Sequence, residues 1–212
     1  AKRASAPAQI NIPRDMWTQV IDIDLPAMVE FERPSGGDKA ILEAAEMLSS
    51  STNPVILNGA GVVLSEGAIE ASKALAERLD APVCVGYQHN DAFPGSHPLF
   101  SGPLGYNGSK AAMELIKEAD VVLCLGTRLN PFSTLPGYGI DYWPQNAKII
   151  QVDINPDRIG LTKKVSVGIV GDAAKVADKI LNELSDNAGD LNRTERKQKI
   201  AELKSRWAQQ LS

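Results

Sequence analysis

Short apolar runs and longer amphipathic segments follow one another in a regular order along residues 38–186. Strands are predicted at the apolar runs, which are residues 54–57, 81–86, 120–126, 148–154 and 165–170. These runs are apolar almost throughout, which is typical of strands that are buried on both faces of a parallel sheet.

The amphipathic segments between these runs predict helices. Three of these helices begin at a residue whose side chain can cap a helix, namely Asp38, Ser109 and Asp172. A fourth helix is predicted from about Glu66 to Leu79. Strands that alternate with helices form parallel sheets with right-handed crossovers. The sequence therefore predicts a three-layer, Rossmann-like α/β domain over residues 38–186, with a parallel sheet of five or six strands.

The segments that flank this domain have a different pattern. Residues 1–37 contain one strand-like stretch, Gln9 to Ile12, and then a linker rich in proline and glycine, so we expect the end of a preceding domain and a linker. Residues 187–212 predict a helical linker to a missing third domain. Its apolar stripe, which we expect to dock on another domain, consists of Ile200, Leu203, Trp207 and Leu211. Because the chain does not begin with Met, we expect a fragment of a longer protein.

Composition narrows the classes of protein that this chain can belong to. The net charge is -4, which argues against nucleic acid and anionic membranes as partners. No apolar run has the roughly 18–20 residues that a transmembrane helix needs, and no signal peptide is present. Cys84 and Cys124 lie inside predicted strands, without a CxxC motif or a nearby histidine, so we expect buried thiols in a reducing cytoplasm.

A glycine turn, Gly59-Ala60-Gly61, follows the first predicted strand. In parallel sheets, ligands bind beyond the carboxyl ends of the strands, where glycines let backbone approach a phosphate and a carboxylate can bind ribose. The candidate cofactor-binding residues at these ends are Gly59, Gly61, Gly126, Thr127, Arg128, Asp153, Asn155, Gly171 and Asp172. Two interpretations stay open: the turn binds a nucleotide, or it only joins a strand to a helix. Arg128 likewise either lies near an anion or forms a surface or structural ion pair.

Several specific chemistries are disfavoured by the residues themselves. A dinucleotide fingerprint needs glycine where Leu64 stands, and the second predicted strand does not end in an acid, which argues against NAD. His89 and His97 share one loop without neighbouring cysteines, so no metal site is predicted, and His97 is expected to be hydrogen-bonded within the loop. Gly171-Asp172-Ala173 lacks the second glycine of the magnesium–diphosphate motif of thiamine enzymes. No catalytic residue is predicted.

An ordered set of segments carries a family resemblance. These segments are "PVILNGAGV", "FPGSHPLFSGPLGYNGS", "ADVVLCLGTRLN", "AKIIQVDINPDRIG" and "VSVGIVGDA". In this order and spacing they resemble the central domain of thiamine diphosphate enzymes of the acetolactate synthase and pyruvate oxidase group. "APAQINIPRD" resembles the last strand of the domain that precedes it in that group. The two long loops, residues 87–108 and 127–146, look most like those of sulfoacetaldehyde acetyltransferases.

The resemblance implies a longer, homo-oligomeric enzyme. Its flanking domains, which belong to the same subunit, would hold thiamine diphosphate and Mg²⁺ between two subunits, and the small-molecule substrate would be sulfoacetaldehyde. The central domain binds FAD or ADP in some relatives and is only structural in others. Three alternatives stay open, namely an acetolactate synthase-like enzyme, a stand-alone module that binds FAD or ADP, and a structural spacer.

Overall fold

The computed structural model describes residues 7, 9–27, 29, 31–188 and 193–212. It divides into two units, Ala1–Arg33 and Pro34–Ser212. In the first unit, the described residues form one short 3-10 turn, Arg14–Met16. The strand predicted at Gln9–Ile12 is not formed, since these residues have no strand neighbour among the described residues to accept their backbone hydrogen bonds.

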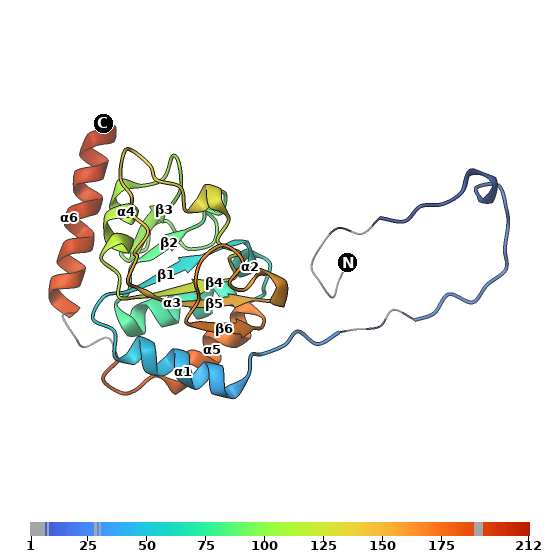
Figure 1. The fold of residues 1–212 in the computed structure, drawn as a ribbon, viewed down its shortest axis with the longest axis horizontal. Coiled ribbons are helices and arrows are strands. Elements are labelled where there is room, and N and C mark those ends of the chain that lie inside the picture. Colours follow the sequence, from blue (N-terminus) through green and yellow to red (C-terminus); the bar gives the residue numbers. More distant parts are fainter. Residues whose placement is uncertain (1–6, 8, 28, 30, 189–192) are drawn as a thin grey trace. The chain divides into compact units, whose positions relative to one another are not determined.

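The second unit is built on a six-stranded sheet in which every pairing is parallel. Its strands are β1 (Pro54–Asn58), β2 (Val83–Val85), β3 (Phe100–Pro103), β4 (Val121–Leu125), β5 (Lys148–Asp153) and β6 (Val167–Val170). Their order across the sheet is β3-β2-β1-β4-β5-β6 (Figure 1). The three-layer α/β prediction is confirmed, with six strands.

Strand β3 was not predicted, because it lies within the segment expected to be a long loop. It has only four residues, and two of them, Gly102 and Pro103, are poor strand formers. Its pairing with β2 also shifts register between Val83 and Cys84. A short, irregular edge strand of this kind gives no apolar run that a sequence pattern could show.

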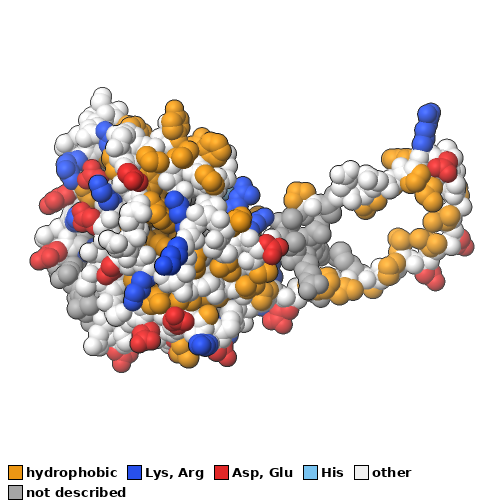
Figure 2. All heavy atoms as spheres, viewed as in Figure 1, with side chains coloured by type: hydrophobic (Ala, Val, Ile, Leu, Met, Phe, Trp, Pro, Cys, Tyr) orange, Lys and Arg blue, Asp and Glu red, His pale blue; other side chains and the backbone are white. Residues whose placement is uncertain are grey.

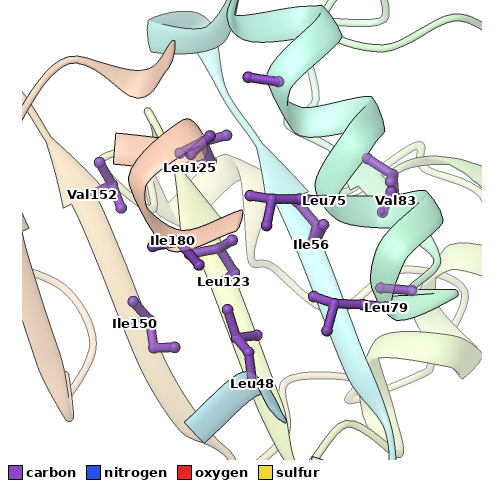
Figure 3. Packing of buried hydrophobic residues seen from close by; sticks show 14 of the residues in the cluster. Leu48, Ile56, Leu75, Leu79, Val83, Leu123, Leu125, Ile150, Val152 and Ile180 are labelled. Atoms are coloured by element: carbon purple, nitrogen blue, oxygen red, sulfur yellow. The ribbon is translucent and has the colours of Figure 1, made fainter. Parts of the chain in front are cut away.

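The helices cover the sheet on both faces. They are α1 (Asp38–Ser49), α2 (Ala60–Val63), α3 (Ala68–Leu79), α4 (Lys110–Lys117), α5 (Ala173–Glu183) and α6 (Arg193–Leu211). Helices α1, α3 and α5 pack together on one face (Figure 1). There, Leu48, Leu75 and Ile180 lie against strand residues such as Ile56 and Leu123 (Figure 3).

The opposite face of the sheet has its own core. It forms between α4 and the strand residues that point away from α1, α3 and α5, among them Val55, Leu57 and Cys124. Both faces of β1 and β4 are therefore buried, which explains why their sequences are apolar throughout.

Two of the three predicted helix caps are formed. The Ser109 hydroxyl accepts a hydrogen bond from the Ala112 amide at 3.3 Å, and the Asp172 carboxylate accepts one from the Ala174 amide at 3.1 Å. Asp38 does not cap its helix, because Gly37 occupies the cap position. The Asp38 carboxylate instead lies 3.0 Å from the Lys179 ammonium on α5.

Asp120 fixes the amino-terminal ends of β1 and β4. Its carboxylate accepts hydrogen bonds from the Ser51 hydroxyl, from the Thr52 amide at 2.8 Å and hydroxyl at 2.9 Å, and from the Asn53 amide at 3.1 Å. Burial alone would raise the pKa of Asp120, but these hydrogen bonds outweigh it and lower the pKa. The carboxylate thus holds the turn before β1 against the start of β4.

Helix α6 packs on this unit, beside α4. The Arg196 guanidinium donates to the carbonyls of Leu79 and Thr52, both at 2.6 Å, and Ile200 and Leu203 are buried. The expectation that the whole apolar stripe docks on another domain is therefore wrong for Ile200 and Leu203. Leu211, at the end of the stripe, is exposed.

Arg78 connects α3 to the segment that follows α5. Its guanidinium donates to the carbonyl oxygens of Ser185 at 2.6 Å, Asp186 at 2.7 Å and Ala188. These bonds hold residues 185–188 against α3, whereas the Arg196 contacts hold α6 on the same unit. Within the described residues, no helix is both long enough and apolar enough to cross a membrane.

We predict that Asp120→Ala lowers the free energy of unfolding by about 1–2 kcal/mol, because it leaves the Thr52 and Asn53 amides without their acceptor. This contribution is present above the ordinary pKa of 3.8 and is lost as the pH falls through the lowered pKa. Urea unfolding at pH 7 and pH 3 measures both effects. Glu43→Ala, which removes an exposed acid from α1, is the control and should change little. Equal stability of the two variants at pH 7 would contradict this role of Asp120.

Candidate functional site

The predicted site residues lie at the carboxyl-terminal edge of the sheet. Gly59 follows β1 and Gly126 follows β4, and these two strands are neighbours at the centre of the sheet. The chain order reverses between them, which makes this the switch point where parallel sheets bind ligands. Asp153 ends β5, and Gly171 follows β6. The parallel topology therefore brings the predicted residues to one edge.

The glycine turn makes a direct backbone contact with the loop after β4. The Gly59 amide donates to the Leu125 carbonyl at 3.0 Å, and the Gly61 amide donates to the Gly126 carbonyl at 2.8 Å. A Cβ atom on Gly61 would lie 2.6 Å from the Gly126 Cα, and one on Gly59 would lie 2.5 Å from the Thr127 Cβ. The glycines are therefore required by the packing of two loops, and both amides already have protein acceptors.

The loop after β4 is shaped by the same contact. Gly126 has a φ of 60°, in the left-handed region, and a Cβ on it would lie 2.7 Å from the Gly61 Cα. Thr127 is buried, and its carbonyl accepts a hydrogen bond from the Gln151 side-chain amide at 3.1 Å. Arg128 is exposed, and no ion pair joins it to another described residue. The surface or structural ion pair considered for Arg128 is therefore not formed within the described part of the chain.

Asp153 and Asn155 organise the turn after β5. Asp153 is buried, and one of its carboxylate oxygens accepts a hydrogen bond from the Asn155 amide at 2.8 Å. The Asn155 side-chain oxygen accepts from the Asp157 amide at 3.0 Å and so caps a short 3-10 turn. The oxygens that could bind a ribose hydroxyl are thus used, in part, by the backbone of this loop.

Gly171 and Asp172 connect the end of β6 to α5. The Asp172 carboxylate accepts from the Ser65 hydroxyl at 2.6 Å as well as from the Ala174 amide. A Cβ on Gly171 would lie 2.5 Å from the Val176 side chain. Because this carboxylate serves as the cap of α5, these residues do not fit a site for Mg²⁺ and a diphosphate.

Tyr142 is a structural residue of this edge that the sequence analysis did not single out. Its hydroxyl accepts from the Gly105 amide at 3.0 Å and donates to the Ser133 carbonyl at 3.2 Å, which joins the two long loops. Burial raises the pKa of Tyr142 to about 12, although the hydrogen bond from Gly105 opposes this shift. The spacing of apolar and polar residues around Tyr142 does not indicate that its side chain is buried.

Aromatic side chains are exposed on these long loops. Tyr106 and Phe132 are each 63% exposed, and Tyr138 is 51% exposed. Tyr138 also lies 5.5 Å from the Trp207 ring of α6, with the Lys110 ammonium 5.1 Å from the Tyr138 ring centre. Hydrophobic side chains gather on the upper part of the globular unit in Figure 2, where Figure 1 shows these loops. This edge therefore presents apolar surface.

The structure shows His97 hydrogen-bonded and both cysteines buried, as the sequence predicts. His97 Nε2 lies 3.1 Å from the Glu77 carboxylate, and Nδ1 accepts from the Leu99 amide at 3.2 Å, so His97 is hydrogen-bonded within its loop. Cys84 and Cys124 are buried free thiols, and burial raises the pKa of Cys84 to about 12. The residues that the structure describes contain no cluster of three or more side chains that could hold a metal ion.

A comparison of the sequence with known protein families agrees with this fold. Residues 41–180 match the family described as "Thiamine pyrophosphate enzyme, central domain". The chain belongs to this family. The resemblance inferred from the ordered segments is therefore confirmed. The glycine turn is consistent with the interpretation in which it only joins a strand to a helix. In the structure, this turn also packs against the loop after β4.

Curated relatives extend this match to the whole chain. The chain is 74% identical over 212 residues to sulfoacetaldehyde acetyltransferase of Roseovarius nubinhibens and covers 35% of that protein. It is 50% identical over 214 positions to the enzyme of the same name from Castellaniella defragrans, of which it covers 36%. It is 37% identical over 185 residues to a probable acetolactate synthase large subunit of Methanocaldococcus jannaschii, a match that covers 84% of this chain and 31% of that protein.

A solved structure supports the fold. Benzoylformate decarboxylase from Polynucleobacter necessarius aligns with a TM-score of 0.67 and 24% sequence identity, over 84% of this chain and 33% of that one. The chain spans about a third of the length of the curated relatives it matches.

We predict that Gly61→Ala lowers the free energy of unfolding by about 2 kcal/mol, because the new methyl group would overlap the Gly126 backbone. Chemical denaturation measures this change. Gly95→Ala is the matched control, since a Cβ there has no neighbour within 4 Å, and it should leave the stability almost unchanged. If Gly61→Ala were as stable as the control, the packing role of this glycine would be wrong.

Proposed function

We propose that this chain is the central domain of a thiamine diphosphate-dependent acetyltransferase that converts sulfoacetaldehyde and phosphate into acetyl phosphate and sulfite. The observation that carries the proposal is the 74% identity over all 212 residues to a sulfoacetaldehyde acetyltransferase. The match to a probable acetolactate synthase, at 37% over 185 residues, is much weaker. The two long loops, whose sequences look most like those of sulfoacetaldehyde acetyltransferases, support the same assignment.

The proposed reaction needs no external oxidant or reductant. The bond between carbon and sulfur breaks, and the sulfonate group leaves as sulfite. The carbon that carried the sulfonate gains a proton and becomes a methyl group. The aldehyde carbon loses its hydrogen as a proton and becomes an acyl group that forms a bond to a phosphate oxygen. Thiamine diphosphate, when bound, supplies the electron sink that such a rearrangement requires.

We assign the present domain a structural role in this enzyme. Its candidate site residues bind one another: the amides of Gly59 and Gly61 have protein acceptors, and Asp172 caps a helix. The groups that hold thiamine diphosphate and Mg²⁺ are proposed to lie in the flanking domains of the same subunit. We also propose that the parent protein is a homo-oligomer, and that it is cytoplasmic, since its two thiols here are free and buried.

A vestigial nucleotide site is the second candidate function for the domain. It is favoured only by position, because Gly59, Asp153 and Gly171 lie at the switch-point edge of a parallel sheet. FAD or ADP would have to bind there without the two glycine amides.

We predict that the parent protein, supplied with thiamine diphosphate, Mg²⁺, phosphate and sulfoacetaldehyde, releases sulfite and acetyl phosphate in equal amounts. Sulfite and acetyl phosphate are measured separately, so that hydrolysis to acetate is detected. Pyruvate serves as the comparison substrate under the same conditions. Formation of acetolactate from pyruvate, without sulfite from sulfoacetaldehyde, would favour the acetolactate synthase alternative and overturn the proposal.

We predict that the isolated 212-residue chain does not bind thiamine diphosphate with Mg²⁺, since its described residues provide no cluster of metal ligands. Isothermal titration calorimetry measures this, with FAD, ADP and NAD titrated in parallel. If an adenine nucleotide binds, amide signals of Gly59, Gly61 and Gly171 should shift, because they lie at the proposed edge. Micromolar binding of thiamine diphosphate with Mg²⁺ would contradict the structural role.

A further inference from the structure

The loop that follows β4 contains a tyrosine in an unusual backbone conformation. Tyr138 and Gly139 have φ angles of 54° and 74°, and the Ile140 amide donates to the Gly137 carbonyl at 2.8 Å. Positive φ at both central residues is the pattern of a type I′ turn, whose first central position favours asparagine, aspartate or glycine. A bulky aromatic residue is strained in this left-handed region, so a contact outside the turn is needed to hold Tyr138 there.

Helices α4 and α6 provide this contact. The Tyr138 ring lies 5.5 Å from the Trp207 ring, measured between ring centres. The Lys110 ammonium lies 5.1 Å from the centre of the Tyr138 ring and 5.3 Å from that of Trp207, distances at which an aromatic ring attracts a cation. The same ammonium donates to the Gln210 side-chain oxygen at 3.0 Å. We refer to Lys110, Tyr138 and Trp207 as the aromatic clamp.

The clamp joins segments that are far apart in the sequence. Lys110 begins α4, and Trp207 lies near the end of α6, which packs beside α4 (Figure 1). The start of the turn is anchored separately, because a Cβ on Gly137 would lie 2.5 Å from the Met113 side chain. A Cβ on Gly139, in contrast, would have no neighbour within 4 Å. The tip of the turn is therefore held through the Tyr138 ring.

We propose that α6 controls the conformation of this loop through the aromatic clamp. While α6 packs beside α4, the clamp holds Tyr138 in the left-handed region. When α6 moves away, the clamp opens and the Tyr138 backbone relaxes to an extended or right-handed conformation, which breaks the hydrogen bond from Ile140 to Gly137. A displacement of α6 thereby reaches the loop that starts at Gly126, at the switch-point edge of the sheet. This inference does not depend on the proposed function.

Hydrogen exchange of the Ile140 amide, followed by NMR spectroscopy, tests the inference in the 212-residue chain. Trp207→Ala removes one ring of the clamp, and we expect the Ile140 amide to exchange at least about tenfold faster, because the turn opens more often. Arg206→Ala is the matched control. Arg206 is the neighbouring residue on α6, and its guanidinium lies 3.3 Å from the Glu114 carboxylate on α4, outside the clamp. This variant should leave the exchange of Ile140 unchanged.

Three outcomes of this experiment would overturn the proposal. The first is unchanged exchange of Ile140 in Trp207→Ala. The second is an equal acceleration in Arg206→Ala, because any loosening of α6 would then have the same effect. The third is an equal acceleration at Leu123, in the centre of the sheet, because Trp207 would then stabilise the whole unit and not the loop.

The backbone strain at Tyr138 provides an independent test. Tyr138→Asn places a favoured residue in the turn but removes the ring from the clamp. In the Trp207→Ala chain, where the contact with the tryptophan is already lost, Tyr138→Asn should slow the exchange of the Ile140 amide. In the presence of Trp207, the same substitution should slow the exchange less, or accelerate it. Equal effects in the two backgrounds would mean that Tyr138 and Trp207 act independently, which would contradict the clamp.

Discussion

The structure of the domain depends on the close backbone contact between the loops that follow β1 and β4. Gly61 and Gly126 approach so closely that neither has room for a side chain, and the Gly61 amide donates to the Gly126 carbonyl. At the other end of the same two strands, Asp120 binds the turn before β1. The central strand pair is therefore fixed at both ends by polar contacts, while apolar side chains bury both of its faces.

This contact has a consequence for the chemistry of the edge. In nucleotide-binding domains of this architecture, amides at the switch point face a phosphate. Here, two amides of the turn face carbonyls of the neighbouring loop instead, and the Asp172 carboxylate faces Ser65 and the first turn of α5. Several polar groups that a ligand could use here are thus engaged in joining loops and capping a helix, which supports the structural role that we propose. The same fold can thus serve as a scaffold, because a fold does not by itself imply a function.

Most of the fold could be predicted from the sequence, because burial on both faces makes a strand apolar throughout and helix caps need specific side chains. Strand β3 could not be predicted, since Gly102 and Pro103 interrupt any apolar pattern and the neighbouring strand determines its position. The positions of the candidate site residues followed from the parallel topology. Their hydrogen-bond partners did not, because the acceptor of the Gly61 amide lies on a loop more than sixty residues further along the chain. The role of Tyr142 in joining the two long loops could not be predicted either, because both of its hydrogen-bond partners lie on other parts of the chain.

The exposed apolar residues indicate where we expect the parent protein to contact this domain. Inside the domain, both faces of the sheet are covered by helices, so the interior of the domain needs nothing more. Exposed aromatic residues are found instead on the long loops at the carboxyl edge, such as Tyr106 and Phe132, and large apolar residues are exposed among the described residues of 9–31. Aromatic residues are enriched where protein surfaces meet. We propose that a domain whose core is buried on both faces of the sheet, and whose exposed apolar groups lie on loops, positions neighbouring domains of the parent protein.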